Sequence, residues 1–177
     1  MNISRFFFKL LIITTYIVRV ALLVFPLAAI IVLAKEGGWK YGFTFIQNNI
    51  EVAAFVSFAI GFLLSFYHAM SFEEVGGAPI KNYMRTRQSV QVRSNKGLDV
   101  VEEFLSNHTK YKNIRRVGNV LTARRNVIFL SPDRVKVTDN GDTFTLESGP
   151  FIFLWFIDFG RNFKNVKEIA RYIKLGK

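Results

Sequence analysis

The chain contains no cysteine among its 177 residues. Disulfide bonds, thiolate metal sites and cysteine nucleophiles are therefore excluded, and the composition fits a reducing compartment. Histidine is scarce as well, because only His68 and His108 occur, and we expect both to be structural. The glycine pairs at 37–38 and 76–77 lack the further glycines and the lysine of a phosphate-binding loop. We therefore expect no cofactor, no metal site and no catalytic role.

Charge is nearly absent from two long apolar stretches. Residues 10–34 contain one charged residue, Arg19, and residues 52–70 contain none. A helix that crosses a bilayer needs about 20 consecutive apolar residues, so both stretches are long enough to span a membrane. The sequence therefore predicts a two-span membrane hairpin over residues 1–71.

Basic residues flank both predicted spans. Arg5 and Lys9 precede the first span, two lysines lie in the connecting loop, and three basic residues follow the second span within residues 81–87. The loop is short and rich in aromatic residues, which is typical of a membrane interface. We expect both termini in the cytoplasm and the spans in a bacterial inner membrane. A cleaved signal peptide ending near residues 32–34 stays open as an alternative for the first span.

Two features of the spans favour helix packing. Arg19 lies about 13 Å along the helix from the start of the first span, where it either reaches the headgroups or makes a polar contact with a partner helix or a nearby acid. Small residues recur every four positions along the second span, which lets another helix approach closely. The members of this stripe are Ala53, Ser57, Gly61 and Ser65. The stripe indicates packing against the first span or against a partner.

The rest of the chain has the pattern of a small folded domain. Residues 72–80 contain two glycines and a proline and are predicted to form a linker, and residues 81–177 are predicted to form a cytoplasmic α+β domain. Hydrophobic periodicity predicts a strand, a helix, one or two strands and a final helix over residues 88–93, 96–107, 114–130 and 162–174. This order favours an antiparallel sheet of four to five strands with two helices on one face.

A β-hairpin is predicted over residues 133–148. The Asn140-Gly141 dipeptide favours a two-residue turn, which would place Val137 opposite Phe144. The apolar side chains that would then share one face are Val135, Val137, Phe144 and Leu146. We predict this register because turn chemistry and alternation both support it.

Residues 151–159 form the most apolar segment outside the predicted spans. Nine residues are too few to cross a bilayer as a helix. A buried strand, insertion at the membrane interface and docking on a partner stay open. The candidate residues for contact with a partner or a membrane are Phe151, Phe153, Trp155 and Phe156.

The sequence from Asp158 to Val166 reads DFGRNFKNV. Together with the predicted hairpin and the helix that opens near Gly97, it resembles a small bacterial α/β domain of uncharacterised proteins. In that domain a final strand leads into a helix that starts with D-aromatic-G-K/R-N-x-x-N-V. The resemblance implies a fold rather than a function. We expect Asp158, Asn162 and Asn165 to cap the final helix.

Positive charge is concentrated after residue 70. This part of the chain contains 19 of the 24 lysines and arginines and 11 of the 13 acids, which gives it a formal charge of about +8. Solvated faces and anionic lipid both account for it, and nucleic acid is disfavoured because no groove-binding helix is evident. We predict a non-catalytic membrane accessory or scaffold subunit that docks a larger membrane-protein complex or forms a homo-oligomer. The alternatives are an anionic-lipid-binding sensor or tether and an inner-membrane immunity protein.

Overall fold

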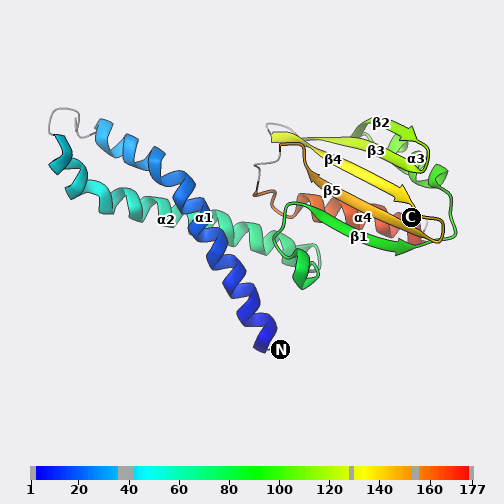
Figure 1. Cartoon of the computed structure of the whole chain (residues 1–177), viewed down its shortest axis with the longest axis horizontal. Helices are drawn as coiled ribbons and strands as arrows, with labels where there is room; N and C mark the ends of the chain where they lie inside the picture. The colour runs from blue at the N-terminus through cyan, green and yellow to red at the C-terminus, as the bar shows by residue number, and fades with distance from the viewer. Residues whose placement is uncertain (1–2, 36–41, 128–129, 153–155, 176–177) are drawn as a thin grey trace. The chain divides into compact units, whose positions relative to one another are not determined.

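The structure is a computed structural model that describes residues 3–35, 42–127, 130–152 and 156–175 (Figure 1). The chain divides into two compact units, residues 1–70 and residues 71–177. Each unit is built from elements that are continuous in sequence, and each is described by itself.

The first unit consists of two long helices, α1 (Ile3–Lys35) and α2 (Gly42–Glu74). Each has 33 residues, which corresponds to a length of about 50 Å. Both are long and apolar enough to cross a membrane, α2 in its part from Asn49. Both helices extend beyond the predicted spans, 10–34 and 52–70, and the last four residues of α2 belong to the second unit.

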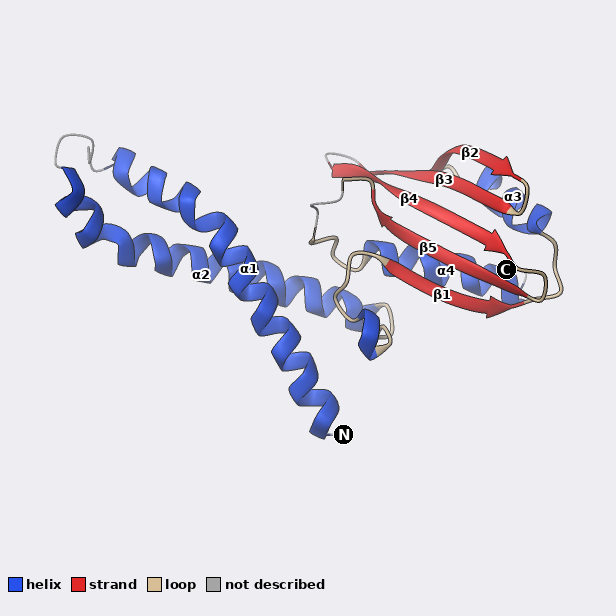
Figure 2. Cartoon of the chain, in the orientation of Figure 1, coloured by secondary structure: helices blue, strands red, loops and turns tan. Residues whose placement is uncertain are grey.

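The second unit has one antiparallel sheet of five strands, in the order β1-β5-β4-β3-β2 (Figure 2). The α+β architecture and the antiparallel sheet are confirmed. The strands are β1 (Gln88–Arg93), β2 (Tyr111–Val117), β3 (Val120–Val127), β4 (Leu130–Asp139) and β5 (Thr143–Pro150). The helices of this unit are α3 (Leu98–Asn107) and α4 (Arg161–Leu175), preceded by a short 3-10 turn at Ile80–Asn82.

Both helices pack on the same face of the sheet, behind it in Figure 2. The hydrophobic core lies between this face and the apolar stripes of α3 and α4. The fully or almost fully buried residues that build it are Val92, Leu98, Val101, Leu105, Leu121, Ala123, Val135, Val137, Phe144, Leu146, Val166, Ile169 and Ile173. Alternation along the strands and the 3.6-residue period of the helices both supply these side chains to one layer.

The predicted linker at residues 72–80 differs from the structure at its start. Residues 72–74 continue α2, and Phe72 is fully buried in the second unit. Its ring stacks on Phe163 of α4 with 5.8 Å between centroids and contacts Tyr83 edge-on at 6.0 Å. The reason is hydrophobic, because the ring is buried against two other aromatic rings of the second unit.

The hairpin between β4 and β5 forms, but in a different register from the predicted one. Val137 faces Leu146 instead of Phe144, and Phe144 faces Asp139. The predicted register is therefore wrong by two residues. A shift of two leaves every side chain on its own face, so Val135 and the other apolar residues of the hairpin still point into the core.

The turn of this hairpin explains the shift. The backbone N–H of Asn140 donates to the carbonyl oxygen of Thr143 at 2.9 Å, which makes Gly141 and Asp142 the two central residues. Gly141 has a φ of 87°, as the first central position of a type II′ turn requires. Its N–H also donates to the carboxylate of Asp139 at 2.9 Å. These contacts select a turn one residue later than the Asn140-Gly141 dipeptide predicts.

The apolar segment at residues 151–159 does not form a strand in its described part. Phe151 and Ile152 form an exposed bend, and the chain from Phe156 to Asp158 has no regular structure. The physical reason is topological, because this segment must carry the chain from the end of β5 to the start of α4 on the helix-covered face. Phe159 and Gly160 complete the turn with φ values of 51° and 69°.

Candidate functional site

The face of the sheet opposite α3 and α4 is left uncovered by the described elements, and we call it the open face (Figure 2). Burial alternates along β5, where Phe144, Leu146 and Ser148 are buried and the residues between them are partly exposed. The open face therefore carries the second set of side chains of each strand. Its composition decides what the domain presents to its surroundings.

Basic side chains dominate the open face. Lys112, Arg124, Arg134 and Gly149 are successive cross-strand partners from β2 to β5. Directly opposed residues have Cβ atoms about 5 Å apart, so three cations stand in one row. The cations of the whole face are Arg87, Arg93, Lys112, Arg115, Arg124, Arg134 and Lys136.

The next row across the sheet holds the acid of this face. It runs through Arg115, Thr122, Lys136, Glu147 and Ser89 as successive partners. The Glu147 carboxylate lies 3.3 Å from the Lys136 ammonium group, in an ion pair whose side chains are both about half exposed. Among the described residues of the open face, one acid thus stands against seven cations.

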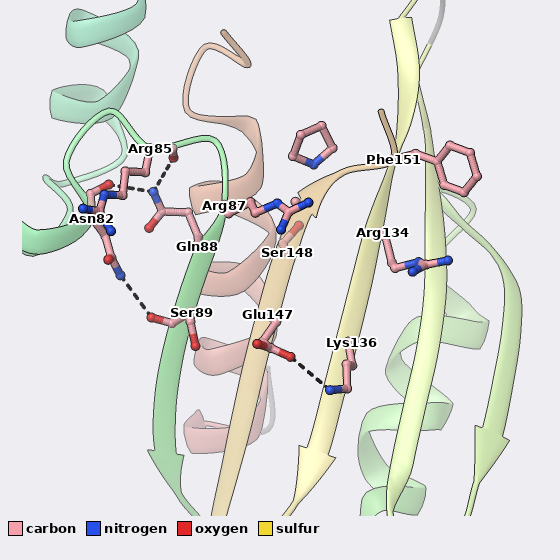
Figure 3. Close-up of a pocket in the computed structure, with 12 residues that line it drawn as sticks. Asn82, Arg85, Arg87, Gln88, Ser89, Arg134, Lys136, Glu147, Ser148 and Phe151 are labelled. Atoms are coloured by element: carbon pink, nitrogen blue, oxygen red, sulfur yellow. Dashed lines mark hydrogen bonds and ion pairs between the residues drawn. The ribbon is translucent and has the colours of Figure 1, made fainter. Parts of the chain in front are cut away.

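Arg87 completes the first row from outside the strands (Figure 3). A Cβ atom built on Gly149 would lie 3.0 Å from Cγ of Arg87, so the glycine leaves room for this side chain. In Figure 3 Arg87 extends across β5 toward the strand that bears Arg134. The Phe151 ring lies over two other guanidinium groups, with its centroid 4.8 Å from Cζ of Arg124 and 5.8 Å from Cζ of Arg134. These cation–π contacts hold two like charges beside each other.

Two neighbouring hollows follow this surface. The larger has a volume of about 570 Å³ and includes Arg87, Arg134 and Phe151 in its lining, and the smaller has about 460 Å³ and includes Arg124. Arg134 and Lys136 line both hollows. The open face is therefore a basic trough rather than a flat sheet, and its chemistry is that of an anion-binding surface.

The structure places the predicted small-residue stripe against α1. Ala53, Ser57, Gly61 and Ser65 are all buried. A Cβ atom on Gly61 would lie 2.7 Å from the backbone oxygen of Ile17, so the two helices approach closely at this glycine. Of the two possibilities left by the sequence, packing within the hairpin accounts for the stripe.

Arg19 is exposed on α1, and its guanidinium carbon lies 5.9 Å from the centroid of the Tyr16 ring. Tyr16 is buried and lies beside His68 of α2, with 5.4 Å between ring centroids. Arg19 is thus placed on the outer surface of the helix, with Tyr16 between it and the helix interface. This position suits a side chain that reaches along the helix toward polar headgroups.

Two of the four residues predicted to contact a partner or a membrane lie within the described part of the chain. Phe151 is 48% exposed and lies at the open face, and Phe156 is half-buried. Phe153 and Trp155 lie outside the described residues. The structure therefore brings one of the four, Phe151, into the basic trough.

The DFGRNFKNV sequence builds a buried polar cluster where α4 begins. The Asp158 carboxylate accepts hydrogen bonds from the backbone N–H groups of Gly160 at 3.2 Å and Asn162 at 2.9 Å, and from the Asn162 amide at 2.8 Å. Arg161 donates two hydrogen bonds to the buried Asp133 carboxylate of β4, at 2.5 and 2.8 Å. Burial raises the pKa of Asp158 to about 6. Asp158 thus caps the helix, and Arg161 ties it to the sheet.

Asn162 and Asn165 tie α4 to β5 instead of capping it. The Ser148 hydroxyl donates to the Asn162 side-chain oxygen at 2.6 Å, and the Asn165 amide donates to Ser148 Oγ at 3.1 Å. Arg125 donates to the Asn165 side-chain oxygen. Because the polar groups of this cluster are engaged with one another, its role is to position the helix.

Sequence reasoning missed the open face as a site. Its cations are spread over β1, β2, β3, β4 and the segment before β1, and none of them belongs to a recognised motif. The signal was present as Arg134 and Lys136 at alternate positions of β4, on the polar side of the strand. Only the strand order and the register show that these positions form one row.

Comparisons with known proteins found no family model, no curated protein and no solved structure that matches the chain. Within the described residues, no group of three or more His, Asp or Glu side chains could hold a metal ion. The function is therefore inferred from the geometry and charge of the open face.

Proposed function

We propose that the chain is a membrane-anchored, non-catalytic tether or sensor whose C-terminal domain binds anionic lipid headgroups through the open face. In this proposal α1 and α2 span a bacterial inner membrane, and both termini and the domain are cytoplasmic. The observation that carries the proposal is the row of cations across an uncovered sheet face, with a single paired acid beside it.

The energetics favour a lipid surface. A basic residue near an anionic leaflet contributes about 1 kcal/mol, so the cations of the open face together supply on the order of 5 kcal/mol before screening. A domain tethered to the membrane is already at high local concentration, so a modest attraction suffices to hold it there. Phe151 and Ile152 are about half exposed beside these cations. Apolar side chains next to basic ones are typical of segments that enter the headgroup boundary.

We assign a binding role to the domain because of the side chains that the open face supplies. Arginine and lysine side chains and the hydroxyl groups of Ser89 and Thr122 recognise anions, whereas both histidines of the chain lie elsewhere. His68 is buried beside Tyr16 in the first unit, and His108 contacts Phe104 edge-on with 4.3 Å between ring centroids.

An accessory subunit that docks a membrane-protein partner is the second candidate. The exposed Phe151 and Ile152 support it, because apolar side chains beside cations also suit an acidic protein surface. The small-residue stripe no longer supports it, since the packing of α2 on α1 uses that stripe.

A fluorescent label on the open face tests the proposal. The chain has no cysteine, so Ser89→Cys places a single thiol on this face and Ser106→Cys places a matched one on the outer side of α3, both at exposed positions. The full-length protein is reconstituted in nanodiscs of phosphatidylcholine with or without phosphatidylglycerol, together with lipids that carry a nitroxide on the headgroup. We expect quenching at position 89 only, dependent on phosphatidylglycerol and reversed by salt.

Equal quenching at the two positions, or quenching at position 89 that is independent of phosphatidylglycerol, would contradict lipid binding by the open face. Protection of the thiol at position 89 by a protein that co-purifies in mild detergent, with no effect of phosphatidylglycerol, would favour the accessory subunit instead.

A further inference from the structure

We infer that the open face contains a defined subsite for a terminal phosphate group, a phosphomonoester or a pyrophosphate, between Arg87 and Arg134 above Gly149. The inference deepens the proposed function, on which it rests, because it names the anion for which the basic surface is shaped. The same chemistry is found in the headgroup of phosphatidic acid and in soluble phosphorylated molecules.

The missing side chain of Gly149 creates the space. Gly149 is the cross-strand partner of Arg134, and the place where its Cβ would stand is 3.0 Å from Cγ of Arg87. Gly149 does not have a positive φ, so the backbone conformation itself does not require glycine. Because Gly149 has no side chain, Arg87 can extend across β5 toward Arg134 (Figure 3).

The side chains around this space are positioned before any ligand binds. Phe151 holds the guanidinium groups of Arg124 and Arg134 over its ring. Arg124 is in turn the cross-strand partner of Arg134 and of Lys112, which extends the positive row. Like charges in such a row repel one another, and a bound anion relieves this repulsion.

The number and geometry of donors favour a terminal phosphate. Each guanidinium presents a planar fork that matches two oxygens of a phosphate group. Two such forks use more oxygens than the two free ones of a phosphodiester, whereas a phosphomonoester or pyrophosphate end offers three and a second negative charge. The nearest acid, Glu147, is one row away and paired with Lys136 at 3.3 Å.

The Gly149→Ala variant distinguishes binding at this subsite from non-specific attraction by the charge of the open face. Gly149→Ala changes no charge, but its methyl group would stand 3.0 Å from Cγ of Arg87, so this side chain must shift. We expect full-length protein in a neutral detergent to bind inorganic pyrophosphate saturably in calorimetric titrations, and Gly149→Ala to weaken that binding about fivefold or more. Arg134→Gln should weaken it about tenfold, the usual effect of losing a charge-assisted contact. Arg171→Gln, the same change at an exposed position on α4, should leave it within about twofold.

Equal affinity of wild type and Gly149→Ala for pyrophosphate, with unchanged thermal unfolding, would overturn the subsite, as would equal affinity for sulfate at the same ionic strength. The proposed lipid binding would survive that outcome if phosphatidylglycerol still quenched the label at position 89. Nanodiscs distinguish the ligand's source. Stronger quenching by phosphatidic acid than by phosphatidylglycerol at equal lipid charge supports a lipid headgroup, and pyrophosphate binding without that preference supports a soluble phosphorylated ligand.

Discussion

At the scale of single residues, the most constrained group of side chains is the polar cluster that joins α4 to the sheet. Asp133, Asp158, Asn162 and Asn165 are all almost completely buried. Buried polar groups are costly unless they are hydrogen-bonded, and here they satisfy one another. The sequence DFGRNFKNV thus supplies a cap, a tight turn and two ties to the strands.

The raised pKa of Asp158 gives a pH dependence with a defined sign. Its pKa is about 6 in the folded protein and 3.8 as the reference value, so between these limits the folded state binds more protons than the unfolded state. Stability should therefore fall as the pH rises through this window, by roughly 3 kcal/mol, and then level off. In urea unfolding at a series of pH values, Asp158→Asn should lack this decline. An unchanged pH profile in the variant would show that Asp158 is not its source.

The two ion pairs of the sheet should differ sharply in energetic weight. Asp133→Asn leaves Arg161 facing a neutral group in a buried site and should cost about 3 kcal/mol of unfolding free energy. Glu147→Gln breaks the exposed pair with Lys136 and should cost less than about 1 kcal/mol. Chemical denaturation of both variants at neutral pH measures the difference. Similar losses in the two variants would contradict the structural role of the buried pair.

At the scale of elements, β1 could be predicted to the residue, because alternation and its flanking polar residues mark both ends of Gln88–Arg93. The faces of β4 and β5 were also predictable. Their register was not, because two registers that differ by two residues place the same side chains in the core. The choice between them depends on contacts that alternation does not encode, such as the hydrogen bond from the Asp139 N–H to the Asn119 carbonyl of the neighbouring turn.

Engineered disulfides test the register directly. Thr138 and Thr145 are cross-strand partners on the open face, and opposed residues lie within the Cα separation that a disulfide spans. Thr138→Cys combined with Thr145→Cys should therefore oxidise readily in this otherwise cysteine-free chain. Thr138→Cys combined with Thr143→Cys, the pair that the Asn140-Gly141 turn would bring together, should oxidise poorly. The opposite order of oxidation rates would support the register predicted from sequence.

The open face shows why the candidate site was harder to predict than the fold. A helix or strand is recognised from local periodicity, but the row of Lys112, Arg124 and Arg134 exists only when three strands pair in the observed register. Arg87 joins the row because a glycine on another strand leaves room for it. In the sequence these residues resemble ordinary solvated positions of polar strand faces.

At the scale of the whole molecule, the proposed topology places the charged domain on the side of the membrane that retains basic residues. Single cysteines at Ser4, Gln47 and Thr109, all exposed positions, test it in intact cells. We expect a membrane-impermeant thiol reagent to label only Gln47→Cys from outside. Labelling of Thr109→Cys would place the domain outside the cytoplasm, and labelling of Ser4→Cys would invert the first helix.

The central claim is that the open face, rather than the net charge of the domain, binds the anionic membrane. It is tested by the label on Ser89→Cys in two charge-matched triple variants, Arg87→Gln with Arg124→Gln and Arg134→Gln on the open face, and Lys164→Gln with Arg171→Gln and Lys174→Gln on α4. We expect quenching in phosphatidylglycerol nanodiscs to be lost in the first variant and kept in the second. Equal loss in both variants would show that the row of cations has no special role, and would contradict the claim.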